Sequence, residues 1–210
     1  MNNKTRRFIV GISGASGVIY AIRLLELLRT VPDVETHLVM SAAAAQTIGL
    51  ETDYTSAQVE ALADKSYRFR DIAAAISSGS FKTDGMIVVP CSMKTLSGIA
   101  YSFSDNLLLR AADVVLKDRR RLIIVPRETP LHLGHLRAMT LVVEMGALLV
   151  PPLPAFYHRP KTIDDIVNQT VNRLLDLIDV ELPDDLFQRW EGGQAAAANK
   201  ANEHKQASNE

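Results

Sequence analysis

Short apolar runs alternate with longer amphipathic segments along most of the chain. Five runs of β-branched and aliphatic residues predict strands that are buried on both faces. They are residues 8–13, 36–40, 86–89, 122–125 and 147–150. The segments between them carry apolar side chains at helical spacing and predict helices. These span residues 18–29, 92–99, 106–117, 132–146 and 162–178, with shorter helices starting at 42 and lying near 56–63.

This alternation predicts an α/β protein with a parallel sheet covered by helices on both faces. Because such crossovers are right-handed, we expect a three-layer, doubly wound domain of the Rossmann or flavodoxin-like class. The pattern runs over residues 1–190, which we interpret as a single domain. Residues 191–210 are rich in Gly, Ala, Asn, Gln, Lys and Glu, with almost nothing to bury, and we expect a mobile tail there.

Composition narrows the function classes. The 210 residues include 23 Lys and Arg against 24 Asp and Glu, a formal net charge of −1. General nucleic-acid binding needs a basic surface, so we expect no nucleic-acid partner. The lone Cys91 excludes an internal disulfide and a multi-cysteine metal site. No run approaches the ~20 apolar residues of a spanning helix, and the three that follow Arg7 are too few for a signal peptide. We therefore expect a cytoplasmic protein.

A cluster of small residues, Gly11 to Gly17 (GISGASG), ends the first predicted strand. Such a cluster either lets backbone amides approach a phosphate or a flat ring, or forms a tight strand-to-helix turn. Its spacing matches neither G-x-G-x-x-G nor a Walker A loop. The second strand ends in Met40 and Ser41, whereas a dinucleotide site would place an acid there, and Glu35 lies at the wrong end. These features favour a mononucleotide such as FMN over NAD.

Polar residues also follow the third strand. Ser92 and Thr95 can donate hydroxyls at the start of a helix, and Lys94 can meet an anion. The alternative is that Ser92 is a simple helix cap. Cys91 precedes them at a helix start, but the candidate histidine partners are distant in sequence, and we interpret it as a buried structural thiol.

Charged residues mark two further positions. Arg127 and Glu128 follow the fourth strand. There the Arg side chain suits a phosphate, and the Glu side chain can act as a proton donor or acceptor. The alternative is that the two residues form a surface ion pair. Arg110 and Lys117 are seven residues apart and so share one helix face. The basic run 119–121 that follows is interpreted as a solvated helix C-terminus.

Two pairs of residues have the spacing of metal ligands but lack the further ligands that a metal site needs. His132 and His135 are three residues apart, without a nearby acid or a third His, and we interpret them as a surface pair. Asp164 and Asp165 open a helix after Thr162, where they fit a cap and an acidic first turn. The sequence predicts no metal site.

Taken in order, eight segments resemble the UbiX-type flavin prenyltransferases over about residues 8–190. They are 14–17 (GASG), 50–53 (LETD), 77–80 (SSGS), 90–92 (PCS), 110–113 with 116–117 (RAAD and LK), 125–128 (VPRE), 154–157 (PAFY) and 189–190 (RW). The stretch 92–95 (SMKT) is similar to the branch of that family described as phenylacrylic or hydroxyarylic acid decarboxylases. Each segment alone is weak evidence, but the ordered set is specific.

The resemblance implies an enzyme that joins a prenyl group from dimethylallyl monophosphate to N5 and C6 of reduced FMN. The prenylated FMN, which has a fourth ring, goes to a UbiD-type decarboxylase. The implied FMN contacts are Gly14, Ala15, Ser16, Ser41, Ser92, Met93, Lys94, Thr95 and Arg127. The implied prenyl phosphate contacts are Lys117, Glu128, Tyr157 and Arg173. The implied catalytic residues are Ser16, Glu51, Arg110, Lys117 and Glu128.

The same resemblance implies a homo-oligomer, a dodecamer, in which Trp190 closes the pocket of another copy of the chain. One departure is visible: the chain has Arg137 where relatives typically carry Glu, which puts the local contacts of that helix in doubt.

Two other functions compete with prenyl transfer. An FMN-dependent cysteine decarboxylase of related fold would carry a His near the first helix and a Pro-x-x-Asn-x-x-Met stretch, and this chain has neither. The other competitor is a non-catalytic, flavin-binding component of an aromatic acid decarboxylase complex. The presence of Lys117, Glu128, Tyr157 and Arg173 together argues against it.

Overall fold

The computed structural model describes residues 5–190 and Gly192, so the tail expected at 191–210 lies outside the described residues except for Gly192. Six parallel strands form one sheet in the order β3-β2-β1-β4-β5-β6. They are β1 (Arg6–Ile12), β2 (Val34–Met40), β3 (Lys65–Tyr67), β4 (Gly85–Cys91), β5 (Arg121–Pro126) and β6 (Leu148–Leu149). The chain reverses its direction of winding between β1 and β4, so this is the switch point of the predicted doubly wound fold.

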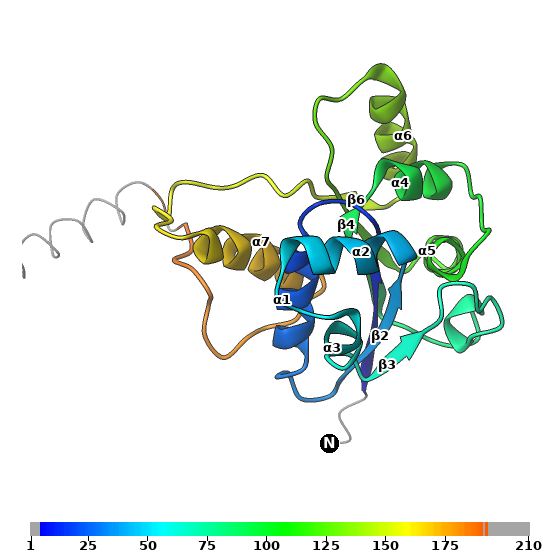
Figure 1. The fold of residues 1–210 in the computed structure, drawn as a ribbon, viewed down its shortest axis with the longest axis horizontal. Coiled ribbons are helices and arrows are strands. Elements are labelled where there is room, and N and C mark those ends of the chain that lie inside the picture. The colour runs from blue at the N-terminus through cyan, green and yellow to red at the C-terminus, as the bar shows by residue number, and fades with distance from the viewer. Residues whose placement is uncertain (1–4, 191, 193–210) are drawn as a thin grey trace, which may run out of the picture.

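Helices cover both faces of the sheet and confirm the predicted three layers (Figure 1). They are α1 (Val18–Leu28), α2 (Ala42–Glu51), α3 (Ser56–Glu60), α4 (Met93–Ala100), α5 (Leu107–Lys117), α6 (Leu133–Glu144) and α7 (Ile163–Leu177), with a 3₁₀ turn at Ala75–Ser77. Helices α1 and α7 pack in one layer, and α4, α5 and α6 in the other. The longest described helix, α7, has 15 residues, and none of the described helices has the length and hydropathy to cross a bilayer.

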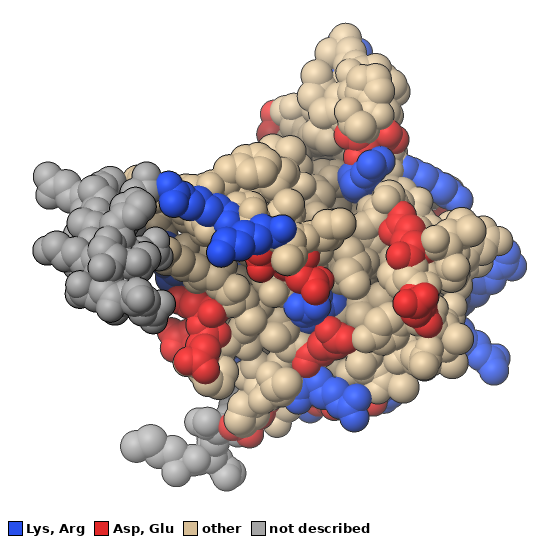
Figure 2. Space-filling model, turned by 60° about the vertical axis from the view of Figure 1, so that its left-hand side comes forward, with Lys and Arg blue, Asp and Glu red and all other residues tan. Residues whose placement is uncertain are grey.

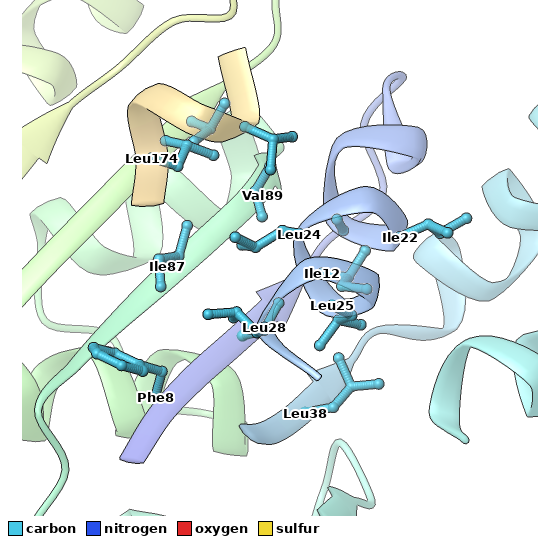
Figure 3. Packing of buried hydrophobic residues seen from close by; sticks show 14 of the residues in the cluster. Phe8, Ile12, Ile22, Leu24, Leu25, Leu28, Leu38, Ile87, Val89 and Leu174 are labelled. Atoms are coloured by element: carbon cyan, nitrogen blue, oxygen red, sulfur yellow. The ribbon is translucent and has the colours of Figure 1, made fainter. Parts of the chain in front are cut away.

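The period-two alternation of β1 divides the core into two clusters. Phe8 and Ile12 point toward α1 and α7, where they meet residues such as Leu24 and Leu174 (Figure 3). Ile9 points to the opposite face and belongs to the cluster built by α4, α5 and α6. All of these side chains are almost completely buried. Burial of both faces explains why the strands are continuous apolar runs, as predicted.

The structure departs from the predicted elements at two strands. The short edge strand β3, whose central residue Ser66 is exposed, was not predicted, because three residues with two polar side chains carry no recognisable alternation. Strand β4 continues through Pro90 to Cys91, two residues beyond its predicted end at Val89. The register to β5 shifts between Val88 and Cys91, which lets the strand accommodate a residue without an amide hydrogen.

The interpretation of residues 119–121 as a solvated helix end is wrong for two of the three arginines. Arg120 is mostly buried and donates to the carbonyls of Gly79 (2.6 Å) and Phe81 (3.0 Å). Arg121 is the first residue of β5 and pairs with Asp179 at 2.8 Å. Both arginines therefore bind loops at the amino edge of the sheet. Local sequence could not reveal these contacts.

Candidate flavin and prenyl phosphate site

The loops predicted to hold FMN meet at the carboxyl ends of β1, β2, β4 and β5, which are neighbours in the sheet. Backbone hydrogen bonds tie these ends together across the strands. The Ser41 amide donates to the Ile12 carbonyl at 3.0 Å, and the Arg127 amide donates to the Cys91 carbonyl at 3.1 Å. The predicted flavin residues therefore lie along one edge at the switch point, where doubly wound folds bind ligands. They are Gly14, Ala15, Ser16, Ser41, Ser92, Met93, Lys94, Thr95 and Arg127.

Close packing explains the small residues after β1. A Cβ atom on Gly14 would lie 2.3 Å from the Cβ atom of Ala43, in the first turn of α2. Gly17 has φ +98°, a left-handed conformation that L side chains rarely adopt, and it is the N-cap of α1. The loop thus lies against α2 while its exposed residue Ser16 remains accessible.

Replacing Gly14 by Ala is expected to destabilise the fold by about 1–3 kcal/mol, because the new methyl group overlaps Ala43. It should also weaken FMN binding, since the loop must move away from α2. Thermal unfolding and FMN titration measure the two effects. Gly49→Ala in α2 is the matched control: nothing lies within 4 Å of the added atom, and we expect slight stabilisation and unchanged FMN binding. Equal behaviour of the two variants would show that the close approach is unimportant.

Glu51, predicted to be catalytic, contacts the start of α1. Its Oε2 atom accepts hydrogen bonds from the amides of Gly17 (2.8 Å) and Val18 (3.3 Å). The protein's own carboxylate therefore lies where an anion at the N-terminus of α1 would bind. This contact makes the loop after β1 a better surface for a flat ring than for a phosphate.

Helix α4 offers the better position for the flavin phosphate. Ser92 is its N-cap, as expected, and its Oγ accepts from the Thr95 amide at 3.3 Å and donates to Thr95 Oγ1 at 3.1 Å. The amides of Met93 and Lys94 in the first turn have no acceptor within the helix. Ser41 caps α2 in the same way and accepts from the Ala44 amide at 3.0 Å. Both proposed roles of Ser92, as cap and as flavin contact, are thus compatible.

Arg127 and Glu128 lie beyond β5 with exposed side chains. The two side chains form no ion pair with each other or with any other described residue, which argues against a purely structural surface pair. Glu128 Oε1 accepts a hydrogen bond from the next amide, that of Thr129, at 2.9 Å. The second carboxylate oxygen is therefore available to a ligand.

Arg110 and Lys117 share a face of α5 with the 77–80 loop beside it. Arg110 Nε donates to the Ser77 carbonyl at 3.1 Å, and its Nη1 pairs with Asp113 at 2.8 Å. Lys117 Nζ pairs with Asp118 at 2.9 Å. Helix α5 ends just before β5 begins, so Lys117 lies toward the amino edge of the sheet, away from the FMN loops.

Tyr157 and Trp190 contact each other, and Arg173 of α7 is linked through Asp176 to Arg189, the neighbour of Trp190. The rings of Tyr157 and Trp190 meet edge to face, with centroids 5.7 Å apart. Arg189 forms two hydrogen bonds with Asp176, which also lies 3.7 Å from Arg173. Because α7 and α5 occupy opposite layers, one chain does not bring Arg173 and Lys117 together (Figure 1). The four predicted prenyl phosphate contacts are not assembled within a single chain.

Cys91 and Asp165 have the surroundings expected of structural residues. Cys91 is fully buried, and desolvation raises the pKa of its thiol well above the usual value, which suits an inert core residue. Asp165 completes a capping box with Thr162, and backbone hydrogen bonds from residues 161 and 162 lower the pKa of its carboxyl. The ring centroids of His132 and His135 lie 3.6 Å apart, with the ring planes tilted by 32°. Among the described residues, no group of three or more His, Cys, Asp or Glu side chains is positioned to hold a metal ion.

The chain matches the Flavoprotein family over residues 1–175. It is 64% identical over 187 residues to the flavin prenyltransferase UbiX of Escherichia coli K12, a match that covers 89% of this chain and 99% of that protein. The chain belongs to the UbiX family of flavin prenyltransferases. Another relative, the flavin prenyltransferase LpdB of Lactiplantibacillus plantarum, is 55% identical over 89% of this chain and 99% of that one.

Solved structures agree with this assignment. A dodecameric FMN-dependent UbiX-like decarboxylase from Escherichia coli O157:H7 superimposes with a TM-score of 0.86 at 54% identity, over 89% of this chain and all of that chain. AnUbiX (PadA1), solved in complex with FMN and dimethylallyl pyrophosphate, has a TM-score of 0.86 at 51% identity, over 90% of this chain and all of that one. The FMN-dependent cysteine decarboxylase SpaF is only 18% identical, with a TM-score of 0.57, and shares the fold alone.

Two contacts at the site were not predicted from the sequence. Ser13 is almost completely buried and its hydroxyl joins the β1 and β4 ends, and Glu51 binds the start of α1. The only local signal for Ser13 is a polar residue that ends an otherwise apolar strand. The contacts of Glu51 with residues 34 and 33 positions earlier depend on how α2 packs, and no local pattern indicates them.

Proposed function

We propose that this chain transfers a dimethylallyl group from dimethylallyl monophosphate to N5 and C6 of reduced FMN, and so makes prenylated FMN. The observation that carries the proposal is the 64% identity to a flavin prenyltransferase over almost the whole length of that protein. The structure supports it, because the residues expected to hold FMN line one edge of the sheet at the switch point. The flavin is both the bound group and the substrate.

The site fits a flavin mononucleotide. The first-turn amides of α4 and the exposed guanidinium of Arg127 suit the phosphate. The loop of small residues after β1 suits the flat ring, and in this proposal the exposed Ser16 forms a hydrogen bond near N5. When bound, reduced FMN supplies two nucleophilic positions, N5 and C6. The protein holds them in position against the donor, which is where much of the rate acceleration in such a reaction originates.

The basic and hydroxyl side chains have the task of releasing the donor's phosphate without a metal ion. The bond between the allylic carbon and the phosphate oxygen breaks, and negative charge grows on the phosphate. Lys117 and Arg173 bind this charge, and the Tyr157 hydroxyl adds a hydrogen bond. Arg110 and Glu51 lie close to the reaction in this assignment. The aromatic rings of Tyr157 and Trp190 exclude water from the donor's carbon chain.

Proton transfer balances the reaction. Two bonds form to the flavin, at N5 and at C6, and each position gives up one proton. One proton adds to the donor's double bond as the fourth ring closes, and the other leaves with the phosphate or to solvent. The flavin thus gains five carbons and eight hydrogens. Glu128 is the proposed proton carrier, because one of its oxygens is free of protein contacts at the carboxyl edge.

Assembly completes the site in this proposal. Arg173 and Lys117 lie in opposite layers of one chain, so a donor phosphate that contacts both must lie between copies. Helix α6 packs against α4 at the edge of the domain (Figure 1) and carries exposed Leu133, Leu136 and Val143. The upper part of the molecule in Figure 2 is largely free of charged residues, as an interface between copies would be. A dodecamer, the state of the UbiX-like decarboxylase, satisfies both observations.

We further propose that prenylated FMN is delivered to a UbiD-type decarboxylase, and that the protein acts in the cytoplasm as one domain over residues 1–190. The chemical test of the activity is the mass of the flavin recovered after anaerobic incubation with a prenyl donor. Parallel incubations with dimethylallyl monophosphate and pyrophosphate separate the two donor forms, since AnUbiX (PadA1) was solved with the pyrophosphate. A flavin that stays unchanged with both donors would overturn the proposal.

A further inference from the structure

Ser13 lies directly behind the FMN loops and is not among the residues that family resemblance assigns to flavin. It follows the last residue of β1 and only 1% of its surface is exposed. A buried hydroxyl must have hydrogen-bond partners to be tolerated. The partners of Ser13 all belong to the two segments that the proposed function assigns to flavin.

The hydroxyl of Ser13 connects the end of β1 with the end of β4. Its Oγ donates to the Pro90 carbonyl at 3.0 Å and accepts from the Ser92 amide at 2.7 Å. The backbone adds two more hydrogen bonds: the Ser13 amide donates to the Pro90 carbonyl at 3.2 Å, and the Ser13 carbonyl accepts from the Ala15 amide at 2.9 Å. One residue therefore shapes the loop that presents Ser16 and anchors the N-cap of α4.

The position of this contact matters because the register pairs of β1 and β4 end at Gly11 and Val88, and beyond them the main chain contributes the bond from the Ser13 amide to the Pro90 carbonyl. Beyond Ser13 and Cys91 the chain continues into two different loops, which the proposed function assigns to the ring and to the phosphate. Ser13 is the side chain that bridges them. It also directs the Ser92 amide inward, so that the ligand-facing amides of α4 are those of Met93 and Lys94.

We propose that Ser13 is a positioning residue for the flavin: it fixes the distance between the ring-binding loop and the N-terminus of α4 without touching the flavin. This inference rests on the proposed function, because it assigns a role at that same site. Three of the four proposed prenyl donor contacts, Lys117, Tyr157 and Arg173, lie elsewhere in the fold. The fourth, Glu128, follows β5, and Ser13 forms its hydrogen bonds with the β1 and β4 segments instead. Loss of the hydroxyl should therefore change the enzyme's response to FMN and leave its response to the donor unaltered.

The experiment compares Ser13→Ala with Thr36→Val in the full chain. Thr36 is a matched control: it is 1% exposed, its hydroxyl donates to Asp64 at 2.9 Å and accepts the Asp64 amide at 3.0 Å, and it lies at the amino half of β2. Both variants lose one buried hydroxyl with two partners. We expect similar losses of thermal stability, but an FMN dissociation constant raised about tenfold only in Ser13→Ala.

Steady-state kinetics distinguish a specific effect on the flavin site from a general destabilisation of the fold, because the KM values for the two substrates are measured separately. For Ser13→Ala we expect the KM for reduced FMN to rise about tenfold, while the KM for dimethylallyl monophosphate changes less than about twofold. Ser13→Cys keeps a weak donor and acceptor at the same position and is expected to fall between Ser13→Ala and the parent. If Ser13→Ala does not assemble, Ser13→Cys must show the same split.

Three outcomes are distinguishable. A raised flavin KM with an unchanged donor KM supports the inference. A folded Ser13→Ala that binds FMN like the parent, or that loses affinity for both substrates equally, overturns the inference and leaves the proposed function intact. A parent protein that binds FMN but does not prenylate it overturns the proposed function, while the FMN affinities of the variants still decide the role of Ser13.

Discussion

Replacing Glu128 by Gln is expected to slow prenyl transfer by about 10²–10⁴-fold, the usual range for removing a general acid or base. The substitution keeps the size of the side chain and its ability to accept the Thr129 amide. It removes the exchangeable proton of the carboxyl group. FMN binding should change less than about twofold, because the phosphate and ring contacts lie on Arg127, α4 and the loop after β1.

The measurement pairs single-turnover rates of flavin modification with FMN titrations on the same preparations. Glu60→Gln is a suitable control, since Glu60 is exposed at the end of α3 and forms no ion pair among the described residues. We expect it to behave like the parent in both assays. Parallel losses of rate and of FMN affinity in Glu128→Gln would instead make Glu128 a binding residue.

Lys117→Ala and Arg173→Ala should each lower the rate by about 10²–10³-fold, since each removes a charge that stabilises the departing phosphate. Mixed oligomers that contain both variants are expected to show the second large effect, a partial recovery of activity. If Lys117 and Arg173 reach a donor phosphate from different copies, co-expressing the two variants creates sites with both residues intact. Random mixing should restore about a quarter of the sites, because each position is intact in half of the copies. Neither variant alone can do this.

The control for this complementation mixes Lys117→Ala with Arg110→Ala. Both residues lie on one face of α5, so the same copy contributes them to a site and no mixture repairs it. We expect no recovery there. No recovery in the mixture of Lys117→Ala with Arg173→Ala would contradict a site shared between copies. Recovery in the control mixture would contradict the assignment of Arg110 and Lys117 of one copy to the same site.

Much of the fold was predictable because its signals are local and repeated. Buried parallel strands are continuous apolar runs, and helix starts such as those at Ser41, Ser92 and Thr162 carry side chains that satisfy free amides. The edge strand β3 was missed because three residues with one apolar side chain give no periodic pattern. The role of Arg120 was missed because its partners, Gly79 and Phe81, are about forty positions away in the chain and meet it only after folding.

The candidate site likewise has a part that was predictable from the sequence and a part that was not. The FMN loops were predictable because parallel strands deliver their carboxyl ends to one edge, whatever the side chains are. The expectation that Lys117 and Arg173 contact one prenyl phosphate depends on how copies of the chain pack together, because α5 and α7 lie in opposite layers of a single chain. The links made by Ser13 and Glu51 depend on the packing of loops against α2 and α4, which sequence spacing does not encode.

The mass of the flavin tests the central claim most directly. The full-length protein is incubated anaerobically with reduced FMN and dimethylallyl monophosphate, and the released flavin is analysed by mass spectrometry. The account predicts a product heavier than FMN by one C5H8 unit, formed only when protein, reduced flavin and prenyl donor are all present. FMN recovered unchanged from a preparation that demonstrably binds it would contradict the account.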